Sequence, residues 1–398
     1  MAEWTPKVRR VSADQRERMV FANALIRERR FKEAQQELEG ILSGDPNSYS
    51  AHMGLGLVLQ AQGLYDDAIR YFERARGLDA MQAQPHYLIG VCRMRQGDLD
   101  AAEASLTAAA KLDAKLPAVH VGLAQVASRR NEFDIAVSRL SDALEIDPQL
   151  VPARLLRARL RNRAGDGKGA IADVEELLEM RPEHRGATVM LANWYDQQGM
   201  TEKGAGLLRQ ALERRPDDPA AWATLGRLRL NSRDLEGAEA AFREVLKRRP
   251  KRLTAKVGLV DALVQQGKQD EARDILKTIP RRGAMAGVVH KLQGDVFFAE
   301  AKYREAVESY RAALLRRANS DEILGSLEKE PAGKGAADWL SLAEQYRSQI
   351  RKVQEDTRTK LAEQDWQRLL DRFRPAILRA VTSRAARNKT PGQLAAAS

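Results

Sequence analysis

Cysteine, aromatic residues and long apolar runs are all scarce in this chain, and each scarcity excludes a class of protein. Cys92 is the single cysteine in 398 residues, so no intrachain disulfide can form and the fold does not depend on oxidation. Aromatic residues make up 5% of the chain, which indicates a modest core per unit length. No run approaches the ~18 apolar residues that a membrane span requires. Runs of β-branched residues with period-two alternation are also missing, so no sheet is expected.

Sequence signatures of catalysis and export are missing as well. The chain contains no phosphate-cradling G-x-x-x-x-G-K-[ST] motif, no H-E-x-x-H and no G-x-S-x-G elbow. Acidic pairs such as Asp66-Asp67 are typical of solvated helix surfaces. The N-terminal residues lack the apolar core of a secretory signal. We therefore predict a cytoplasmic protein that is not an enzyme and needs no cofactor, and the abundant alanine and arginine favour a bacterial source.

Small residues recur at a constant spacing through most of the chain. A first column, at steps of 34 residues, is Ala34, Ala68, Ala102, Ala136, Ala170, Gly204, Ala238, Ala272 and Ala306. A second column, twelve residues upstream, is Ala22, Gly56, Gly90, Ala124, Ala158, Ala192, Gly226, Val260 and Gly294. A column of larger apolar residues, four residues downstream of the first, is Leu38, Phe72, Leu106, Leu140, Val174, Leu208, Phe242, Leu276 and Tyr310. This uninterrupted register indicates an array of structural repeats.

Each repeat contains two apolar stripes of helical spacing that are separated by a turn. Glycine often marks that turn, as at Gly63 and Gly97. Proline often follows the second stripe, as at Pro46, Pro148 and Pro250, and proline cannot continue a helix interior. Facing small residues let the two helices approach closely, while the large residue fills the space beside them. One such hairpin cannot bury its apolar face alone, so successive hairpins must stack.

The 34-residue period, the three columns and the terminal prolines resemble the tetratricopeptide repeat. With residue 15 as the first position, the repeats begin at residues 15, 49, 83, 117, 151, 185, 219, 253 and 287. The resemblance implies an all-α fold, a right-handed α-solenoid superhelix of nine helical hairpins with further C-terminal helices. In repeat 8, Val260 occupies a small-residue position and Pro280 comes early, so we expect looser packing. In repeat 5, Arg157 and Arg161 stand where apolar residues are usual, so we expect a local irregularity.

The register divides the chain into five parts. We expect an N-terminal extension (1–14), nine tandem repeats (15–320), a capping helix and linker (321–335), a basic amphipathic helical segment (336–389) and a disordered tail (390–398). In the helical segment, apolar residues at spacings of three and four are Trp339, Leu342, Tyr346, Ile350 and Val353. Six basic residues and no acidic one lie between Arg372 and Lys389. This pattern favours docking to a partner, to a second copy or to the protein's own groove over contact with a membrane.

In the tetratricopeptide family, repeat positions 2, 5, 9, 12 and 13 face a concave groove that the first helices line. The residues here that we predict to bind a protein are Met19, Asn23, Met53, Leu57, Tyr87, Val91, Met94, Arg95, Arg129, Arg159, Arg163 and Asn193. Methionine adapts its shape to irregular apolar partners, and arginine offers forked donors to carboxylates. The predicted ligand is therefore a peptide or helix with apolar anchors and acidic flanks. Alternatively, neighbouring repeats cover the apolar positions and the arginines form only a solvated face.

Some tetratricopeptide proteins hold a C-terminal carboxylate with Lys and Asn at positions 5 and 9 of one repeat. Repeat 1 has Asn23 but carries Met19 in place of the lysine. Two repeats later, Gln84 and Leu88 stand where such a clamp has Lys and Arg. The clamp is therefore incomplete, and a reader of chaperone tails is disfavoured.

A ladder of histidines at the repeat spacing raises the question of a metal site. The ladder consists of His52, His86 and His120, with His290 in the same phase. Equivalent positions on stacked hairpins lie roughly 10 Å apart, whereas zinc bonds measure about 2 Å. We interpret the histidines as filling the slot that Trp222 fills in repeat 7, and Cys92 as a small buried hydrophobe. No metal site and no catalytic residue is predicted.

The net charge of +11 leaves three functional hypotheses open. The favoured one is a non-catalytic scaffold or adaptor that binds a protein partner and assembles or targets a complex. A nucleic-acid-associated protein would use the arginine rows and the basic tail, but the charge is spread along the chain and disfavours this reading, as it does membrane contact. Finally, the array suits a targeting subunit of an enzyme complex whose catalytic chain is separate.

Overall fold

The computed structural model of the chain describes residues 13–280, 286–315 and 336–352. The numbered helices in these ranges are α1 (Ala13–Arg27), α2 (Phe31–Gly44), α3 (Tyr49–Gln62), α4 (Tyr65–Leu78), α5 (Ala83–Gln96), α6 (Leu99–Leu112), α7 (Pro117–Arg129), α8 (Phe133–Ile146), α9 (Val151–Arg163), α10 (Gly167–Met180), α11 (Arg185–Gln197), α12 (Thr201–Arg214), α13 (Pro219–Asn231), α14 (Leu235–Arg248), α15 (Leu253–Gln265), α16 (Gln269–Lys277), α17 (Ala286–Ala299) and α18 (Tyr303–Leu314). Residues 336–352 form a further helix, and the described ranges contain no strand. The predicted all-α class is confirmed. Among the described helices, none is long and apolar enough to cross a membrane.

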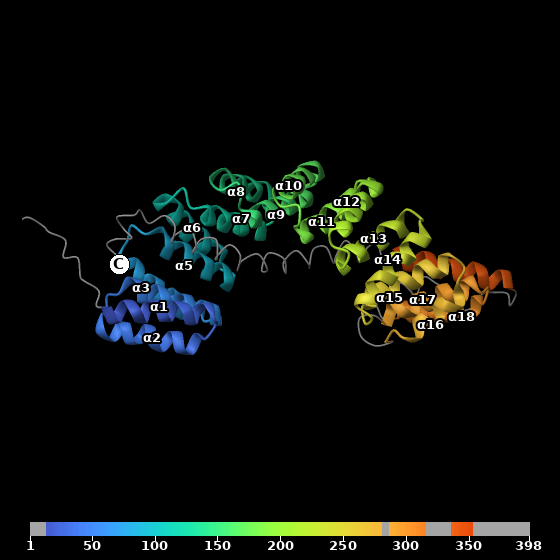
Figure 1. Cartoon of the computed structure of the whole chain (residues 1–398), viewed down its shortest axis with the longest axis horizontal. Coiled ribbons are helices and arrows are strands. Elements are labelled where there is room, and N and C mark those ends of the chain that lie inside the picture. Colours follow the sequence, from blue (N-terminus) through green and yellow to red (C-terminus); the bar gives the residue numbers. More distant parts are fainter. Residues whose placement is uncertain (1–12, 281–285, 316–335, 353–398) are drawn as a thin grey trace, which may run out of the picture. The chain divides into compact units, whose positions relative to one another are not determined.

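The described residues form two compact units, which we call unit 1 (up to Ala170) and unit 2 (from Ile171). Odd-numbered helices up to α17 are the first helices of hairpins, and even-numbered helices are the second. Within each unit the hairpins follow one another in chain order (Figure 1). Successive helices contact one another, as α3, α4 and α5 do in unit 1 and α13, α14 and α15 do in unit 2. The predicted solenoid of stacked helical hairpins is therefore confirmed.

The helices begin and end at the capping and turn residues that recur in the repeat. Helix α3 starts after Ser48, whose hydroxyl accepts a hydrogen bond from the backbone N–H of Ala51 at 3.4 Å. Gly63 and Gly97 end α3 and α5 with φ of 83° and 90°. Glycine adopts this left-handed conformation without a steric penalty, so it ends a helix cleanly. The first helices from α3 to α15 begin at steps of 34 residues, because the same punctuation recurs in each repeat.

The column residues explain how the hairpins close. A Cβ on Gly56 would lie 2.3 Å from Cε1 of Phe72, and a Cβ on Gly294 would lie 2.4 Å from Cδ1 of Tyr310. Both aromatic side chains are fully buried. The absent Cβ therefore makes the space that each large residue fills, and burial of that residue stabilises the hairpin.

Repeat 5 shows no irregularity within its first helix, so that expectation is wrong. Helix α9 runs unbroken from Val151 to Arg163. Nη1 of Arg157 donates to Oγ of Ser141 at 3.1 Å, and Nε of Arg161 lies 3.8 Å from a carboxylate oxygen of Asp166. Long arginine stems can pack along apolar surface while their heads reach polar partners, so the helix tolerates both residues.

Repeat 8 differs from its neighbours mainly in its second helix. Helix α16 has nine residues, whereas α14 has fourteen, and α16 ends before Pro280. Val260 is nonetheless fully buried and belongs to a core that also contains Phe242 and Leu263. Repeat 8 therefore has a shorter second helix but keeps a packed core around Val260.

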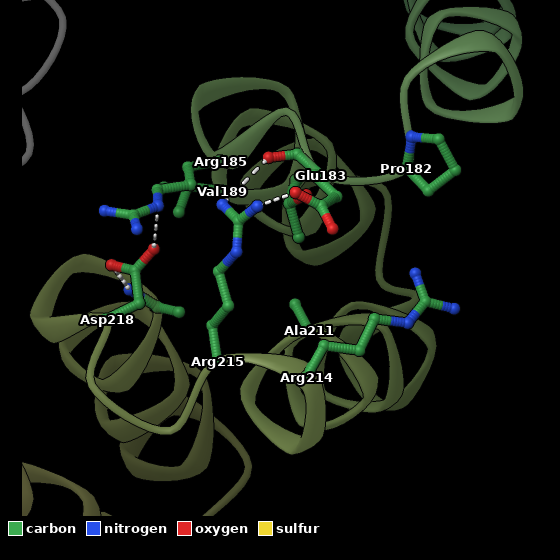
Figure 2. A pocket seen from close by; sticks show the side chains of 10 residues that line it. Pro182, Glu183, Arg185, Val189, Ala211, Arg214, Arg215 and Asp218 are labelled. Carbon is green, nitrogen blue, oxygen red and sulfur yellow. Dashed lines mark hydrogen bonds and ion pairs between the residues drawn. The ribbon is translucent and has the colours of Figure 1, made fainter.

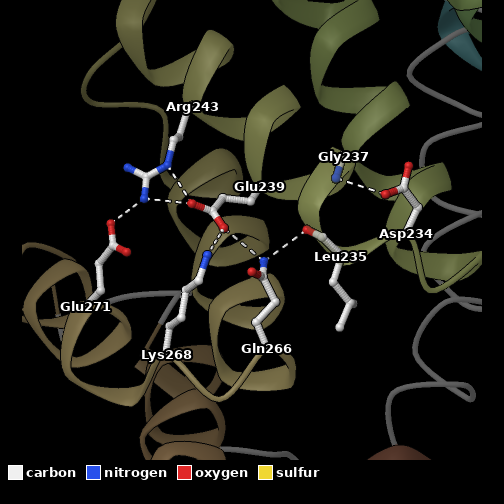
Figure 3. A network of polar contacts seen from close by, with 8 residues as sticks. All are labelled: Asp234, Leu235, Gly237, Glu239, Arg243, Gln266, Lys268 and Glu271. Atoms are coloured by element: carbon white, nitrogen blue, oxygen red, sulfur yellow. Dashed lines mark hydrogen bonds and ion pairs between the residues drawn. The ribbon is translucent and has the colours of Figure 1, made fainter.

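Polar side chains link neighbouring repeats in both units. Nε2 of Gln96 donates to Asp66 at 2.8 Å in unit 1, and Nε2 of Gln266 donates to Glu239 at 2.9 Å in unit 2. Figure 3 shows the second link, in which Arg243 and Lys268 also reach the Glu239 carboxylate. Partial burial acts to raise the pKa of Glu239, but these hydrogen bonds outweigh it and hold the pKa at about 2, below the ordinary 4.5. The carboxylate therefore stays ionised and joins repeats 7 and 8.

The helix at residues 336–352 covers the last repeat. Its Leu342, Tyr346 and Ile350 are buried in one cluster with Tyr310 and Leu314 of α18. The regularly spaced apolar residues of this helix therefore pack into the protein's own core beside the last repeat. The expected capping helix and linker at 321–335, the end of the basic segment at 353–389 and the tail at 390–398 lie outside the described residues.

Candidate functional site

The surface predicted to bind a partner lies on the first helices, and eleven of its twelve residues belong to unit 1. Helices α1 and α3 contact each other, as do α5 and α7. We call the residues at repeat positions 2, 5, 9, 12 and 13 of α1, α3, α5, α7 and α9 the inner face of unit 1. Asn193 lies on α11 in unit 2 and is therefore considered separately.

The apolar part of the predicted site is mostly buried, which corrects the expectation of an open strip. The exposed fractions are 6% for Met53, 4% for Tyr87, 3% for Val91 and 1% for Met94. Helix α5 contacts α4, α6 and α7, so large apolar side chains on it retain little accessible surface. Met19 and Leu57 are half-buried and keep part of their surface accessible. Only these two supply apolar contact area without rearrangement.

The polar part of the predicted site is more accessible. Asn23 is exposed, and the predicted arginines are half-buried: Arg95, Arg129, Arg159 and Arg163. Nη1 of Arg129 donates to the backbone oxygen of Met94 at 2.6 Å, and the guanidinium of Arg163 lies 5.0 Å from the ring centre of Phe133. These contacts hold the stems of Arg129 and Arg163 in place, which lowers the entropy lost when a guanidinium binds a ligand.

The inner face of unit 1 carries charge of one sign. None of its positions in repeats 1 to 5 holds an aspartate or glutamate. Its cations are Arg16, Arg27, Arg95, Arg129, Arg159 and Arg163. A surface with this composition attracts an acidic partner and repels a basic one.

The corresponding positions of unit 2 hold acids, of which Asp196 and Asp295 pair with nearby cations. Nη1 of Arg227 donates to Asp196 at 3.0 Å, and Nη2 of Arg227 donates to the side-chain oxygen of Asn193 at 2.5 Å. Burial acts to raise the pKa of Asp196, but the hydrogen bonds from Arg227 and neighbouring donors lower it overall. The structure therefore places Asn193 in a link between α11 and α13, apart from the other predicted residues.

A second polar cluster of unit 2, which the sequence analysis missed, surrounds Asp295. The Asp295 side chain is 5% exposed, accepts a hydrogen bond from Tyr310 Oη at 2.8 Å and lies 2.6 Å from Lys291 Nζ. Nε of Arg347, on the helix at 336–352, lies 3.6 Å from the same carboxylate. The four-residue spacing of Lys291 and Asp295 in the sequence could have predicted their ion pair. The contact of Arg347 with Asp295 could not be predicted, because it depends on tertiary packing. Asp295 thus fixes the covering helix to the last repeat.

Two histidines of the ladder, His52 and His120, have the structural role that the sequence suggested. Nε2 of His52 donates to the backbone oxygen of Pro46 at 3.0 Å, and Nε2 of His120 donates to that of Ala114 at 3.0 Å. Nε1 of Trp222 makes the same contact with Pro216 at 2.7 Å. Within the described ranges, no group of His, Cys, Asp and Glu is arranged to hold a metal ion.

Cys92 is fully buried, and burial raises the pKa of its thiol to about 12. Gln60 Nε2 donates to its sulfur at 3.4 Å. A thiol that stays protonated and inaccessible is a poor nucleophile. The interpretation of Cys92 as a buried hydrophobe is therefore confirmed.

Models of known protein families match most of the repeat array. Two family models described as tetratricopeptide repeat match residues 19–80, 57–117 and 155–219 in one case, and residues 93–160 in the other. A third model, described as the cytochrome c-type biogenesis protein H TPR domain, matches residues 192–323. A search of curated protein sequences finds no match.

Several solved structures are similar to the chain at low sequence identity. A tetratricopeptide repeat protein from Parabacteroides merdae is 18% identical with a TM-score of 0.48, over 66% of this chain and 98% of that one. A thermophilic tetratricopeptide repeat protein from Thermus thermophilus is 18% identical with a TM-score of 0.40, over 45% and 98% of the two chains. PilF of Pseudomonas aeruginosa is 16% identical with a TM-score of 0.44, over 52% and 95%.

Proposed function

Because the chain belongs to the tetratricopeptide repeat family, we propose that it is a non-catalytic scaffold that captures a segment of a partner protein on the inner face of unit 1. Repeat arrays of this kind present a long surface made of equivalent helices, so one ligand can contact several repeats at once. The partner is proposed to be a peptide or helix with acidic flanks and a few apolar anchors, and the outcome is the assembly or targeting of a complex.

The observation that carries this proposal is the acid-free inner face of unit 1. Six arginines and no acid occupy its positions, while the corresponding positions of unit 2 hold Asp196, Asp261 and Asp295. Stacking of equivalent helices does not require this one-sided charge, because the same stacking occurs in unit 2 without it. A carboxylate-bearing ligand is the class that such a surface recognises best.

The burial of Met53 and Tyr87 changes which residues should be tested. Charged substitutions at buried positions would unfold the hairpins, so loss of binding would carry no information. Met19 and Leu57 are half-buried on the same face and suit the test better. Ile135, which is 52% exposed on the second helix α8, is a matched apolar control in the same unit.

The test is affinity purification of partners with the full chain, quantified by mass spectrometry. The double variant Met19→Asp/Leu57→Asp should lose its captured partner, whereas Ile135→Asp should retain it, and both should keep the helical circular dichroism of the wild type. Equal capture by the wild type and the double variant would contradict the proposal.

Docking of the C-terminal segment 353–398 on the same surface is the alternative that the sequence left open, although the basic residues between Arg372 and Lys389 oppose it on a face of arginines. If it docks there, removing it should increase partner capture by the wild type, and added segment peptide should compete with the partner. If it does not, truncation should leave capture unchanged. Either result keeps the inner face as the ligand surface and decides whether the chain regulates itself.

We also propose a cytoplasmic location, which is supported by the single, buried cysteine, because the fold needs no disulfide. The match of residues 192–323 to a domain from cytochrome c biogenesis makes an extracytoplasmic location the specific alternative. Fractionation of cells that produce the tagged chain separates the two. Recovery with periplasmic markers would contradict the cytoplasmic proposal.

A further inference from the structure

The turns between consecutive repeats carry a different residue type in unit 1 and in unit 2 at one repeat position. Position 31, which directly follows the second helix, is Asp45, Asp79, Asp113 and Asp147 in the first four repeats. In the next three repeats it is Arg181, Arg215 and Arg249. The charge at this position therefore changes sign once along the chain, between repeats 4 and 5.

The aspartate has a clear local role in unit 1. Oδ1 of Asp113 accepts a hydrogen bond from the backbone N–H of Lys115 at 2.9 Å. Oδ1 of Asp45 does the same for Asn47 at 3.2 Å, and Oδ1 of Asp79 does so for Met81 at 3.2 Å. An acidic side chain thus closes each turn by accepting from the residue two positions later. Arginine has no acceptor, so the turns of unit 2 lack this bond.

Arginine in the same place adds charge to the turn. A single cation at a helix C-terminus interacts favourably with the helix dipole, so one arginine per turn has a structural reason. The connection between α14 and α15 goes further: of the six residues 247–252, which include the last two of α14, five are basic and the sixth is Pro250. The dipole accounts for one cation there and does not account for Arg249, Lys251 and Arg252, all of which are exposed.

The arginine-bearing turns surround two adjacent hollows of unit 2. We call residues 181–185, 214–218 and 247–252 the turn edge. The first hollow has an apolar floor that includes Pro182, Val189 and Ala211, with Arg185, Arg214 and Arg215 around it (Figure 2). The second hollow, about 620 Å³, is lined by Pro219, Ala220 and Ala223 and by Arg248, Arg249, Lys251 and Arg252. Asp218 lines both hollows, so they adjoin each other at this residue.

The turn edge already binds carboxylates of its own chain. Figure 2 shows Arg215 turned toward Glu183 and Arg185 turned toward Asp218, while Arg214 extends away from both acids. Arg215 is paired with Glu183 through its guanidinium, and Nε of Arg185 lies 3.7 Å from Asp218. These pairs show that a carboxylate reaches the guanidinium groups at the rim of the first hollow. The second hollow offers the same chemistry from Arg249 and Lys251.

We propose that the turn edge of unit 2 is a second docking surface, which binds an acidic protein segment that combines carboxylates with apolar side chains. Carboxylates would meet Arg249, Lys251 and Arg252, and the apolar side chains would rest in the second hollow, because the first hollow, about 30 Å³, is too small for a side chain. The surface is separate from the inner face of unit 1, because all of its residues belong to unit 2. It therefore stands even if the proposed function of unit 1 fails.

Other polyanions fit the turn edge less well. Single-stranded nucleic acid is held by aromatic side chains that stack on bases, and the turn edge contains no Phe, Tyr or Trp. A membrane surface favours large apolar side chains beside the cations, and the exposed large apolar residues of the described chain lie elsewhere, as at Met81 and Leu315.

The single buried cysteine allows a reporter to be placed at the turn edge. Ala220 is exposed and lines the second hollow, so Ala220→Cys can carry an environment-sensitive dye while Cys92 stays protected. The labelled full chain is titrated with a synthetic peptide of about 15 residues built from Glu-Asp-Leu triplets. A peptide of Ser-Asn-Leu triplets, an oligothymidylate of similar length and anionic vesicles serve as comparison ligands.

The proposal predicts saturable binding of the acidic peptide that weakens as salt is added. The variant Arg249→Asp/Arg252→Asp should bind about tenfold more weakly. This variant should fold, because aspartate at 249 restores the turn bond of unit 1 and aspartate at 252 is a favourable N-cap. Arg233→Asp, in the turn at the other end of α14, is the matched control and should change affinity by less than about twofold.

Four results would overturn the proposal. They are no saturable response to the acidic peptide, equal binding by the double variant, equal weakening by Arg233→Asp, and tighter binding of the oligothymidylate or the vesicles. The unit 1 variant Met19→Asp/Leu57→Asp should leave the dye response unchanged, which separates this test from that of the proposed function.

Discussion

Unit 1 and unit 2 share one repeat but place their basic residues differently. In unit 1 the inner face carries arginine, as at Arg95 and Arg163, and the turns after the second helices carry aspartate. In unit 2 the inner face carries acids, of which Asp196 pairs with Arg227, and the turns carry arginine. The comparison teaches that the small and large columns fix the architecture, while charge at the remaining positions varies independently and differentiates the surfaces.

The core should respond alike in both units, because the same column fills the same space. Phe72→Ala in unit 1 and Phe242→Ala in unit 2 should each lower the free energy of unfolding by about 3–5 kcal/mol. Phe72 lies against Gly56, and Phe242 lies against Gly226 and Gly258, so neither cavity can collapse easily. Urea unfolding followed by circular dichroism measures both. A cost below about 1 kcal/mol in either unit would show that its column does not stabilise the hairpin as core.

The acid sensitivity of the two units should differ because of Glu239. Its folded pKa of about 2 lies below the ordinary 4.5, so the carboxylate contributes stability that is complete above about pH 4.5 and is lost as the pH falls toward 2. We expect a loss of about 1–3 kcal/mol over this range. Urea unfolding at a series of pH values, with Glu239→Gln as the comparison, isolates this contribution. An identical pH profile for both chains would contradict the link between repeats 7 and 8.

The equivalent acid of unit 1 provides a matched test at neutral pH. Glu239 is 14% exposed and has several donors, whereas Glu103, at the same repeat position, is 49% exposed and pairs with Arg130. Glu239→Gln should therefore cost about 2 kcal/mol, and Glu103→Gln should cost about 0.5 kcal/mol. Chemical denaturation of both variants measures the difference. Equal costs would mean that burial does not distinguish the two links.

The turns should give the smallest effects, with opposite signs. Asp113→Arg removes the acceptor of the Lys115 N–H and should cost about 0.5–1 kcal/mol. Arg249→Asp supplies such an acceptor and should be neutral or slightly stabilising. Differential scanning calorimetry measures both shifts. If Arg249→Asp destabilises the chain as much as Asp113→Arg does, the arginine has a structural role that the turn geometry does not show.

The fold was largely predictable because its determinants are local and repeated. Gly63 and Gly97 marked helix ends, the columns at Ala34 and Phe72 marked the packing of each hairpin, and the helix starts follow the same step. The prediction for repeat 5 failed because the reach of arginine side chains to Ser141 and Asp166 depends on tertiary neighbours. Local pattern therefore predicts the array better than it predicts exceptions within it.

The candidate site was less predictable, because family positions say which helix face a residue occupies and not how much of it stays accessible. Met53 and Tyr87 sit on the expected helices yet are buried, while Leu57 keeps accessible surface. Asn193 occupies a groove-facing position of the family, but in the structure it accepts a hydrogen bond from Arg227 in unit 2. The step from aspartate to arginine at position 31 was visible in the sequence, but its meaning required the turn bonds seen in the structure.

Site-specific cross-linking of the captured partner tests the central claim most directly. A photoreactive residue replaces Leu57 on the inner face of unit 1 in one chain, and Ile135 on α8 in a second chain. The account predicts that the partner cross-links through position 57 and does not cross-link through position 135. Cross-linking through position 135 with none through position 57 would contradict the claim that the inner face of unit 1 holds the ligand.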